Sequence, residues 1–504
     1  MSLRDSFKPV AVAAALVLLT ACGTQVVNPV SGRNERTVMD ESSEIAEGRK
    51  AHQQLLAEYG ALANPRLQTY VNDLGQALAK HSHRANLQWT FTVLDSPEIN
   101  AFALPGGFVY VTRGLMAYMD SEADLAGVIG HEIGHVTARH SAQRATREQN
   151  AGIGVLAATV LGVLVEGVTG AQGVAQAAGQ LGQGVAAGRL ASYSREQESQ
   201  ADELGAEYLA RARYNPRNMV DVIQVLKTQE RFAADRASAD GRAAAAGGGW
   251  LASHPSNDKR LADIQQIAAR YNGRYDDDGR SRYLEALNGL PFGETSAQGL
   301  TRGRNFYHGD LGIALTAPPG WQIRNGADAV TLVNGSGDAG LIVRLLPTDA
   351  GRTHEEIIRT VIKPSDGRLE RRNLNGFSAT HFEGTRRSDQ GLSQPVAVSI
   401  VSGPGNRNFL LQYAAKDAAA MQRAASQTME AEASFRPLSA SDRAAAQPWT
   451  VQVVPFPAGG FAELARRSPM PAADAALRLL NGAYGGGGGG GGEPRQGSAV
   501  KTVR

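Results

Sequence analysis

Apolar positions recur at helical spacing through much of the first half of the chain. Within residues 41–80, Leu67, Val71, Leu74 and Leu78 fall three and four positions apart, and Asn64-Pro65 divides this stretch into two predicted helices. Ser121 is a favourable N-cap for a long apolar helix that we expect to run past His140. A further helix is predicted over Ser194–Arg213. The first part of the chain is therefore expected to be mainly helical.

Two short segments carry the alternating pattern of strands instead. Leu87–Leu94 alternates and is rich in Thr, Val and aromatic residues. Asn100–Thr112 contains two such runs, which turn at Pro105-Gly106-Gly107. These runs predict a small sheet beside the helices, with residues 100–104 as an edge strand.

The pattern changes twice in the second half of the chain. Residues 291–303 shift to Gly, Ser and Thr, which indicates that a first domain over residues 41–290 ends there. Residues 304–437 contain several alternating runs and two helical stretches, so they predict a small α+β accessory domain. Residues 449–504 predict a strand, two short helices and a strand, interrupted by a flexible run of eight glycines, Gly485–Gly492. The expected fold class is α+β.

The first residues have the pattern of an export signal. Arg4 and Lys8 precede an apolar run that is too short to cross a bilayer. The run ends in Leu19-Thr20-Ala21-Cys22, which resembles the bacterial lipobox, so we expect a signal peptide over residues 1–21 and lipid on Cys22. Polar residues 22–40 are then a tether. This pattern predicts an outer-membrane lipoprotein that faces the periplasm of a Gram-negative bacterium.

Charge and composition exclude some classes of partner. The 51 basic and 49 acidic residues nearly balance and form no basic block, so no nucleic-acid partner is expected. Residues 151–190 are rich in Gly, Ala and Val, but Glu166 and four glycines favour a helical hairpin over a membrane span. Residues 235–249 are of low complexity and predict a loop.

A metal-binding pattern lies in the long predicted helix. His131-Glu132-Ile133-Gly134-His135 is an HExxH sequence, and residues four apart on a helix share one face. Both imidazoles can therefore bind one ion, while Glu132 can reach a water beside it. The flanking residues are apolar, so the helix is expected to be buried, and buried polar side chains need a partner such as a metal.

A catalytic zinc needs a third protein ligand as well as an open position. Ser141 occupies the position where a third histidine would complete one known pattern, and His140 is interpreted as an ordinary polar helix residue. Glu198 is the better candidate, because Asp202 follows it by four residues and can accept a hydrogen bond from a ligand histidine. Glu196 and Glu203 lie on other faces of that helix.

Three separate stretches resemble one known family of zinc peptidases, which includes the CaaX prenyl proteases, the HtpX membrane proteases and the periplasmic BepA-like enzymes. They are NAFALPGGFVYVTRGLM, EADLAGVIGHEIGHVTARHS and SREQESQADELG, within about residues 41–271. The resemblance implies a zincin-type domain of the gluzincin class, with Glu198 as third ligand and Asp202 supporting it. It also singles out Ser253-His254-Pro255, where His254 would act as a latch or as an oxyanion donor. The spanning helices and helical repeats of some relatives have no counterpart here.

The expected activity is hydrolysis of peptide bonds with one Zn²⁺ per chain. His131, His135 and Glu198 would hold the zinc, and Glu132 would be the catalytic general base. An extended substrate would pair with the edge strand at Asn100, Ala101, Phe102 and Ala103. Tyr193, Arg195 and His254 are alternative oxyanion donors.

These features predict an endopeptidase that cleaves unfolded or misassembled envelope proteins. The alternative is a chaperone or assembly factor of outer-membrane proteins with little proteolysis. The C-terminal segment 449–504 resembles a degenerate LysM module, which would bind peptidoglycan. The intact Glu132 favours cleavage over a purely assembling role.

Overall fold

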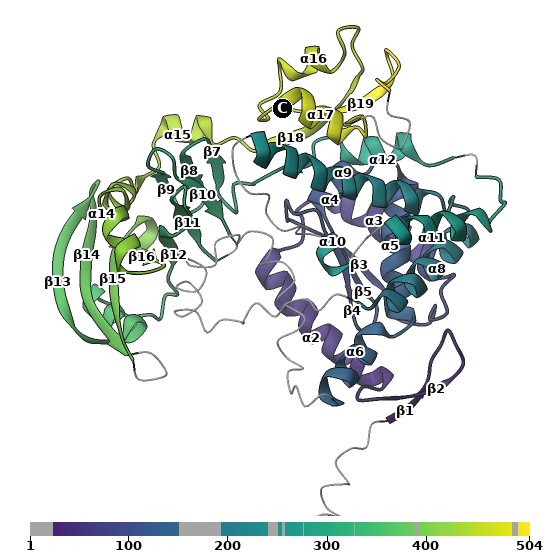
Figure 1. Ribbon diagram of the computed structural model, residues 1–504, viewed down its shortest axis with the longest axis horizontal. Helices are drawn as coiled ribbons and strands as arrows, with labels where there is room; N and C mark the ends of the chain where they lie inside the picture. The colour runs from purple at the N-terminus through teal and green to yellow at the C-terminus, as the bar shows by residue number, and fades with distance from the viewer. Residues whose placement is uncertain are drawn as a thin grey trace, which may run out of the picture.

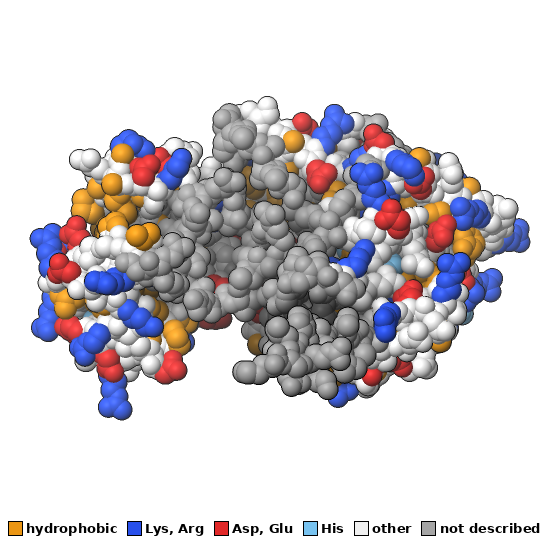
Figure 2. All heavy atoms as spheres, turned by 60° about the horizontal axis from the view of Figure 1, so that its bottom comes forward, with side chains coloured by type: hydrophobic (Ala, Val, Ile, Leu, Met, Phe, Trp, Pro, Cys, Tyr) orange, Lys and Arg blue, Asp and Glu red, His pale blue; other side chains and the backbone are white. Residues whose placement is uncertain are grey.

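The computed structural model describes residues 24–150, 193–239, 250–254, 258–275, 277–326, 328–387, 392–485 and 492–504. Cys22, the expected signal peptide, most of the predicted 235–249 loop, the predicted hairpin at 151–190 and most of the glycine run lie outside these residues. The described part is α+β, as predicted, with a helical body and a separate β-rich body (Figure 1). Figure 2 shows acidic and basic side chains interspersed over the described surface of one face.

The helical body surrounds one central helix, α5. Its helices begin where the sequence provides caps: Asn64 accepts from the Leu67 amide at the start of α3, and Ser121 and Asp124 form a capping box at α5. The helices are α2 (Glu41–Tyr59), α3 (Pro65–Ala79), α4 (Arg113–Tyr118), α5 (Glu122–Thr137), α6 (His140–Asn150), α8 (Arg195–Arg211), α9 (Asn218–Ala239), α10 (Trp250–Ser253), α11 (Asp258–Ala269) and α12 (Arg280–Leu287).

A three-stranded sheet lies beside these helices. Its strands are β3 (Thr90–Leu94), β4 (Ala101–Leu104) and β5 (Phe108–Thr112), in the order β3-β5-β4. Strand β5 pairs parallel with β3 and antiparallel with β4. Among the described residues β4 pairs with β5 alone, so it is an edge strand there, as predicted.

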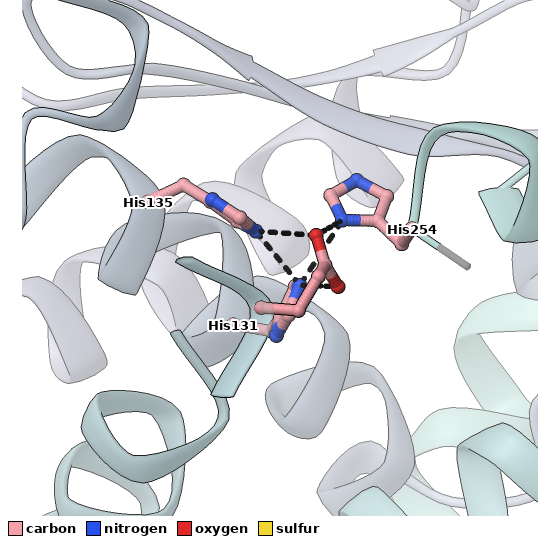
Figure 3. Close-up of side chains that lie close together, drawn as sticks. His131, His135 and His254 are labelled. Atoms are coloured by element: carbon pink, nitrogen blue, oxygen red, sulfur yellow. Dashed lines mark hydrogen bonds and ion pairs between the residues drawn. The ribbon is translucent and has the colours of Figure 1, made fainter. Parts of the chain in front are cut away.

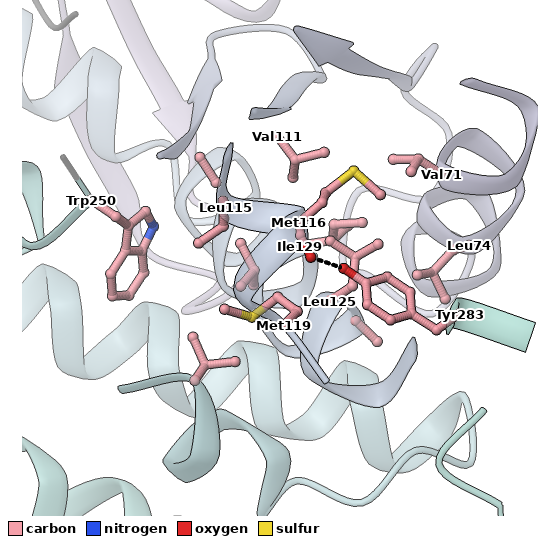
Figure 4. Close-up of a cluster of buried hydrophobic side chains, with 14 of the residues drawn as sticks. Val71, Leu74, Val111, Leu115, Met116, Met119, Leu125, Ile129, Trp250 and Tyr283 are labelled. Atoms are coloured by element: carbon pink, nitrogen blue, oxygen red, sulfur yellow. Dashed lines mark hydrogen bonds between the residues drawn. The ribbon is translucent and has the colours of Figure 1, made fainter. Parts of the chain in front are cut away.

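Helix α5 is buried along its whole length. Apolar side chains from α3, β5, α4 and α12 surround it, and Tyr283 donates a 2.7 Å hydrogen bond to the Met116 carbonyl within this core (Figure 4). Burial of each such side chain contributes about 1.5–3 kcal/mol, so the packing holds α5 firmly. The labelled core residues are Val71, Leu74, Val111, Leu115, Met116, Met119, Leu125, Ile129, Trp250 and Tyr283.

Two expectations for this body were wrong. Residues 24–37, part of the predicted tether over residues 22–40, form a two-stranded hairpin of β1 (Thr24–Val27) and β2 (Asn34–Thr37), and Asn28 at its turn lies against the Ala138 carbonyl. The helix that carries the HExxH residues does not run past His140. It ends at Thr137, Arg139 adopts a left-handed φ of 60°, and α6 begins at His140.

The accessory body contains two antiparallel sheets. The larger has the order β10-β11-β12-β16-β15-β14-β13, the smaller β17-β9-β8-β7, and α14 packs on the larger. Its elements are β7 (Leu300–Arg302), β8 (Asn305–His308), β9 (Ile313–Thr316), β10 (Gln322–Asn325), β11 (Val330–Val333), β12 (Ala339–Leu345), α13 (His354–Ile357), β13 (Pro364–Leu374), β14 (Phe377–Arg387), β15 (Ser393–Ser402), β16 (Asn408–Ala415), α14 (Ala418–Ala433), β17 (Arg436–Pro437) and α15 (Ala440–Ala445).

The C-terminal segment has the predicted strand–helix–helix–strand order. Strand β18 (Trp449–Pro455) pairs with β19 (Ala499–Val503) and also with β6 (Pro291–Phe292), and α16 (Gly460–Ala465) and α17 (Ala473–Leu480) lie between them. Its side chains join the core of the helical body, and the buried Lys501 ammonium donates to the carbonyls of Ala117 and Met119. This segment is therefore a part of the first body rather than a detached module. Among the described residues, no helix is both long and apolar enough to cross a bilayer.

Candidate metal centre

Small residues let α5 and α8 approach each other closely. A Cβ at Gly134 would lie 2.9 Å from the Ala201 carbonyl oxygen, and one at Gly205 would lie 3.1 Å from the His131 backbone nitrogen. A capping box between Ser194 and Gln197 starts α8 just before Glu198. The close contact places Glu198 opposite the two histidines of α5.

Four potential ligands converge at this contact. One donor atom from each of His131, His135, Glu198 and His254 lies within 4.8 Å of all the others, and all four side chains are buried. The Nε2 atoms of His131 and His135 are 3.0 Å apart, and Glu198 oxygens lie 3.7 and 3.5 Å from them. Figure 3 shows the three histidine rings turned toward one another. The predicted metal-binding residues are thus brought together.

The donor set fits a metal ion. The Nδ1 atom of His131 lies 2.9 Å from Asp202, so the ring proton belongs there and the Nε2 lone pair faces that of His135. Two facing lone pairs repel unless a cation lies between them. Tetrahedral zinc with Zn–N bonds of 2.0–2.1 Å separates its ligand atoms by about 3.3 Å, close to the spacing of these two nitrogens.

Arg260 stabilises the carboxylates behind the ligands. It donates two 2.9 Å hydrogen bonds to Asp202, and its Nη1 lies 2.7 Å from Glu198. Burial alone would raise the pKa of Asp202, but Arg260 outweighs it and holds that pKa at about 2. Burial raises the pKa of Glu198 to about 7, although His131 and Arg260 act in the opposite direction. Asp202 is therefore a charged acceptor for His131.

The segment Trp250–His254 covers the metal centre. The His254 Nδ1 atom lies 3.0 Å from Glu198 and 3.2 Å from His131, and its Nε2 lies 3.4 Å from Glu132. The Trp250 indole donates a 3.0 Å hydrogen bond to Glu132, while the other oxygen of that carboxylate has no hydrogen-bond partner among the described residues. Trp250 also donates its backbone N–H to the Ile99 carbonyl, next to β4.

The interpretation of His140 as an ordinary polar residue was wrong. The side chain is fully buried, and its Nδ1 lies 2.8 Å from Nδ1 of His135. The break between α5 and α6 turns His140 back toward the centre, which a continuous helix would not do. Tyr193 stacks on the His135 ring at 3.9 Å between centroids, with its hydroxyl near Ser141.

Other residues considered from the sequence lie elsewhere. Glu196 and Glu203 are exposed, and so is Arg195. Asn100 lies just before β4, and its carbonyl accepts from the Thr112 amide. Sequence reasoning missed Trp250, Arg260 and Gln200, because no local spacing connects them to the HExxH residues.

A buried HExxH helix crossed by a helix that supplies a glutamate defines a metallopeptidase domain of the gluzincin class. Comparison with known proteins agrees: residues 65–268 match peptidase family M48. The chain therefore carries a domain of this metallopeptidase family, and the resemblance found in the three motifs is confirmed.

Three curated relatives illustrate the similarity. The beta-barrel assembly-enhancing proteases of Yersinia pestis and Escherichia coli (strain K12) are 31% and 30% identical over 241 residues, which are 48% of this chain and 47% of each relative. The mitochondrial metalloendopeptidase OMA1 of Arabidopsis thaliana is 31% identical over 191 residues, 38% of this chain and 34% of the relative. The chain thus matches about half the length of the first two relatives.

Proposed function

We propose that the protein is a zinc-dependent endopeptidase that cleaves unfolded or misassembled envelope proteins. The observation that carries this proposal is the position of Glu132 beside the converging donor atoms. Its Oε1 lies 3.4 Å from Nε2 of His254, and a donor atom of His254 converges with those of His131, His135 and Glu198. A carboxylate in that position has a use in hydrolysis and none in a purely structural metal site.

Different residues of the site would carry out different steps of hydrolysis. A zinc ion bound here would lower the pKa of a water molecule and polarise the substrate carbonyl. Glu132 takes the proton of the attacking water and passes it to the leaving nitrogen. Burial raises the pKa of Glu132, which suits a group that must hold the proton between these steps. Asp202 keeps the His131 ring in the tautomer that leaves Nε2 free.

Strand β4 is the proposed substrate-binding edge. Asn100 directs its carbonyl toward β5, and successive residues of a strand turn their N–H and C=O groups to opposite sides. The N–H and C=O groups of Ala101 and Ala103 therefore lie on the open edge. An extended substrate pairing there would be held by backbone hydrogen bonds, which favour unfolded chains over any one sequence. Phe102 is buried among apolar side chains and would support the strand.

We further propose that lipid on Cys22 anchors the protein to the periplasmic face of the outer membrane, and that residues 449–504 contact peptidoglycan. The lipobox-like sequence supports the anchor, and the βααβ order supports the LysM-like reading. Incubation with purified sacculi tests the second proposal: retention of the full chain with the sacculi supports it, and an unbound chain contradicts it.

A second candidate function is that of a chaperone or assembly factor with little proteolysis. It is favoured by the segment Trp250–His254, which lies over the site. His254 lies among the ligands and Trp250 binds Glu132. We propose that His254 is a latch rather than an oxyanion donor, because its Nδ1 occupies a ligand position. Degradation of reduced casein by the full chain, compared with Glu132→Gln, separates the two functions: casein cleavage that the variant loses supports the protease.

A further inference from the structure

The break between α5 and α6 has a defined cause. Arg139 holds the left-handed turn, because its Nε lies 3.2 Å from the buried Glu44 and its Nη2 donates to the Met39 carbonyl. A non-glycine residue at positive φ costs about 1–3 kcal/mol and persists only where its surroundings hold it. The turn therefore places His140, the next residue, with its ring edge against His135.

The hydrogen bonds around His140 fix the positions of two ring protons. Nε2 of His140 lies 2.9 Å from Oε1 of Gln200, and an amide oxygen only accepts, so Nε2 carries the proton. Neutral imidazole has one proton, which leaves Nδ1 of His140 as an acceptor. His135 then donates from its own Nδ1, 2.8 Å away. Nε2 of His135 keeps its lone pair, directed at the metal centre.

We propose that His140 and Gln200 are positioning residues that fix the tautomer of the ligand His135. This inference rests on the proposed metal binding by His135. It assigns to an uncharged His–Gln pair the task that Asp202 performs for His131. Tyr193 supports the same ring from its face, so the plane and the tautomer of His135 are held by different neighbours.

The orientation of the Gln200 amide decides the outcome. If its NH₂ group faced His140, Nε2 of His140 would accept a hydrogen bond and its Nδ1 would donate one to Nδ1 of His135. Nε2 of His135 would then carry a hydrogen and could not bind a metal. A glutamate at this position only accepts, whereas a methionine has a similar shape without a strong acceptor. Gln200 is half-buried, so neither change alters a fully buried side chain.

The test is the zinc dissociation constant of the full chain, measured by competition with a chelator. We expect Gln200→Glu to bind zinc at least as tightly as the wild type and Gln200→Met to bind it about 10- to 100-fold more weakly. Ser199→Glu, on the exposed neighbouring position, measures the effect of charge alone. Equal zinc affinity of Gln200→Met and the wild type would overturn the proposed role of His140 and Gln200. A wild type that binds no zinc would overturn the proposed function instead.

The ring protons give a readout that does not depend on activity. In the zinc-free protein labelled with ¹⁵N-histidine, long-range ¹H–¹⁵N spectra should show His135 protonated at Nδ1 and His140 at Nε2. The opposite pair of tautomers would contradict the proposal. His140→Asn, whose amide oxygen can take the place of Nδ1, should retain more zinc affinity than His140→Leu, and equal losses in the two variants would also contradict it.

Discussion

The indole nitrogen of Trp250 donates a 3.0 Å hydrogen bond to Glu132, the proposed general base. The same residue binds the Ile99 carbonyl through its backbone N–H, beside the edge strand β4. One short segment thus contacts both the base and the approach to the proposed substrate strand. His254, four residues later, adds a contact with Glu198. Under the proposed function, an extended substrate on β4 would have to displace these contacts.

Removal of the His254 side chain should therefore increase cleavage. Its contacts with the carboxyl groups of Glu198 and Glu132 should stabilise the closed state by about 1.5 kcal/mol, so His254→Ala should raise the open fraction and the rate about tenfold. The measurement is the initial rate of casein degradation at saturating zinc. A rate equal to that of the wild type would contradict the latch, and a lower rate would show that His254 assists the reaction.

The close approach of α5 and α8 should be necessary for metal binding. In Gly134→Ala the new methyl group would lie 2.9 Å from the Ala201 carbonyl oxygen, so the helices must separate at a cost of about 1–3 kcal/mol. We expect weaker zinc binding although no ligand is changed. Gly289→Ala, a strained site with open space around it, controls for a general loss of stability in a thermal unfolding experiment.

Asp202 should contribute to metal affinity without touching the metal. Asp202→Ala leaves Nδ1 of His131 without its acceptor and Arg260 without its strongest partner, so zinc should bind about 10- to 100-fold more weakly. Chelator competition measures the change. Glu203→Ala, an exposed carboxylate on the same helix, should leave the affinity unchanged, and an equal loss there would contradict the assignment.

Lys501 should make stability depend on pH. Burial lowers the pKa of its ammonium to about 7, whereas the unfolded chain has a value near 10.4. Between these values the unfolded state binds more protons, so the free energy of unfolding should rise with pH by up to about 1.4 kcal/mol per unit. Urea unfolding at pH 7 to 10 should show this rise in the wild type and a smaller one in Lys501→Met. Identical slopes would contradict it.

Local patterns were sufficient for the central helices, for the strands of the small sheet and for part of the site. The spacing of His131 and His135 is set by one helical turn, and the caps at Asn64 and Ser121 are visible in the sequence. The four-residue spacing of Glu198 and Asp202 indicated the third ligand, which lies 63 residues beyond His135 along the chain, and the resemblance supported that choice.

Local sequence patterns could not predict the long-range contacts around the metal centre. Nothing local predicts that a left-handed Arg139, held by Glu44, returns His140 to His135. The same holds for Trp250 and Arg260, whose partners are far away in sequence and are brought near by tertiary packing. The β1–β2 hairpin was missed because its short, polar strands carry little alternation.

The most direct test of the account compares the full chain with Glu132→Gln, each loaded with zinc, in the degradation of reduced casein. Bound zinc is measured in both samples. The account predicts that the two proteins hold equal zinc, about one ion per chain, and that only the wild type cleaves. Equal rates in the two zinc-loaded proteins would contradict the assignment of Glu132 as the general base and, with it, the proposed endopeptidase site.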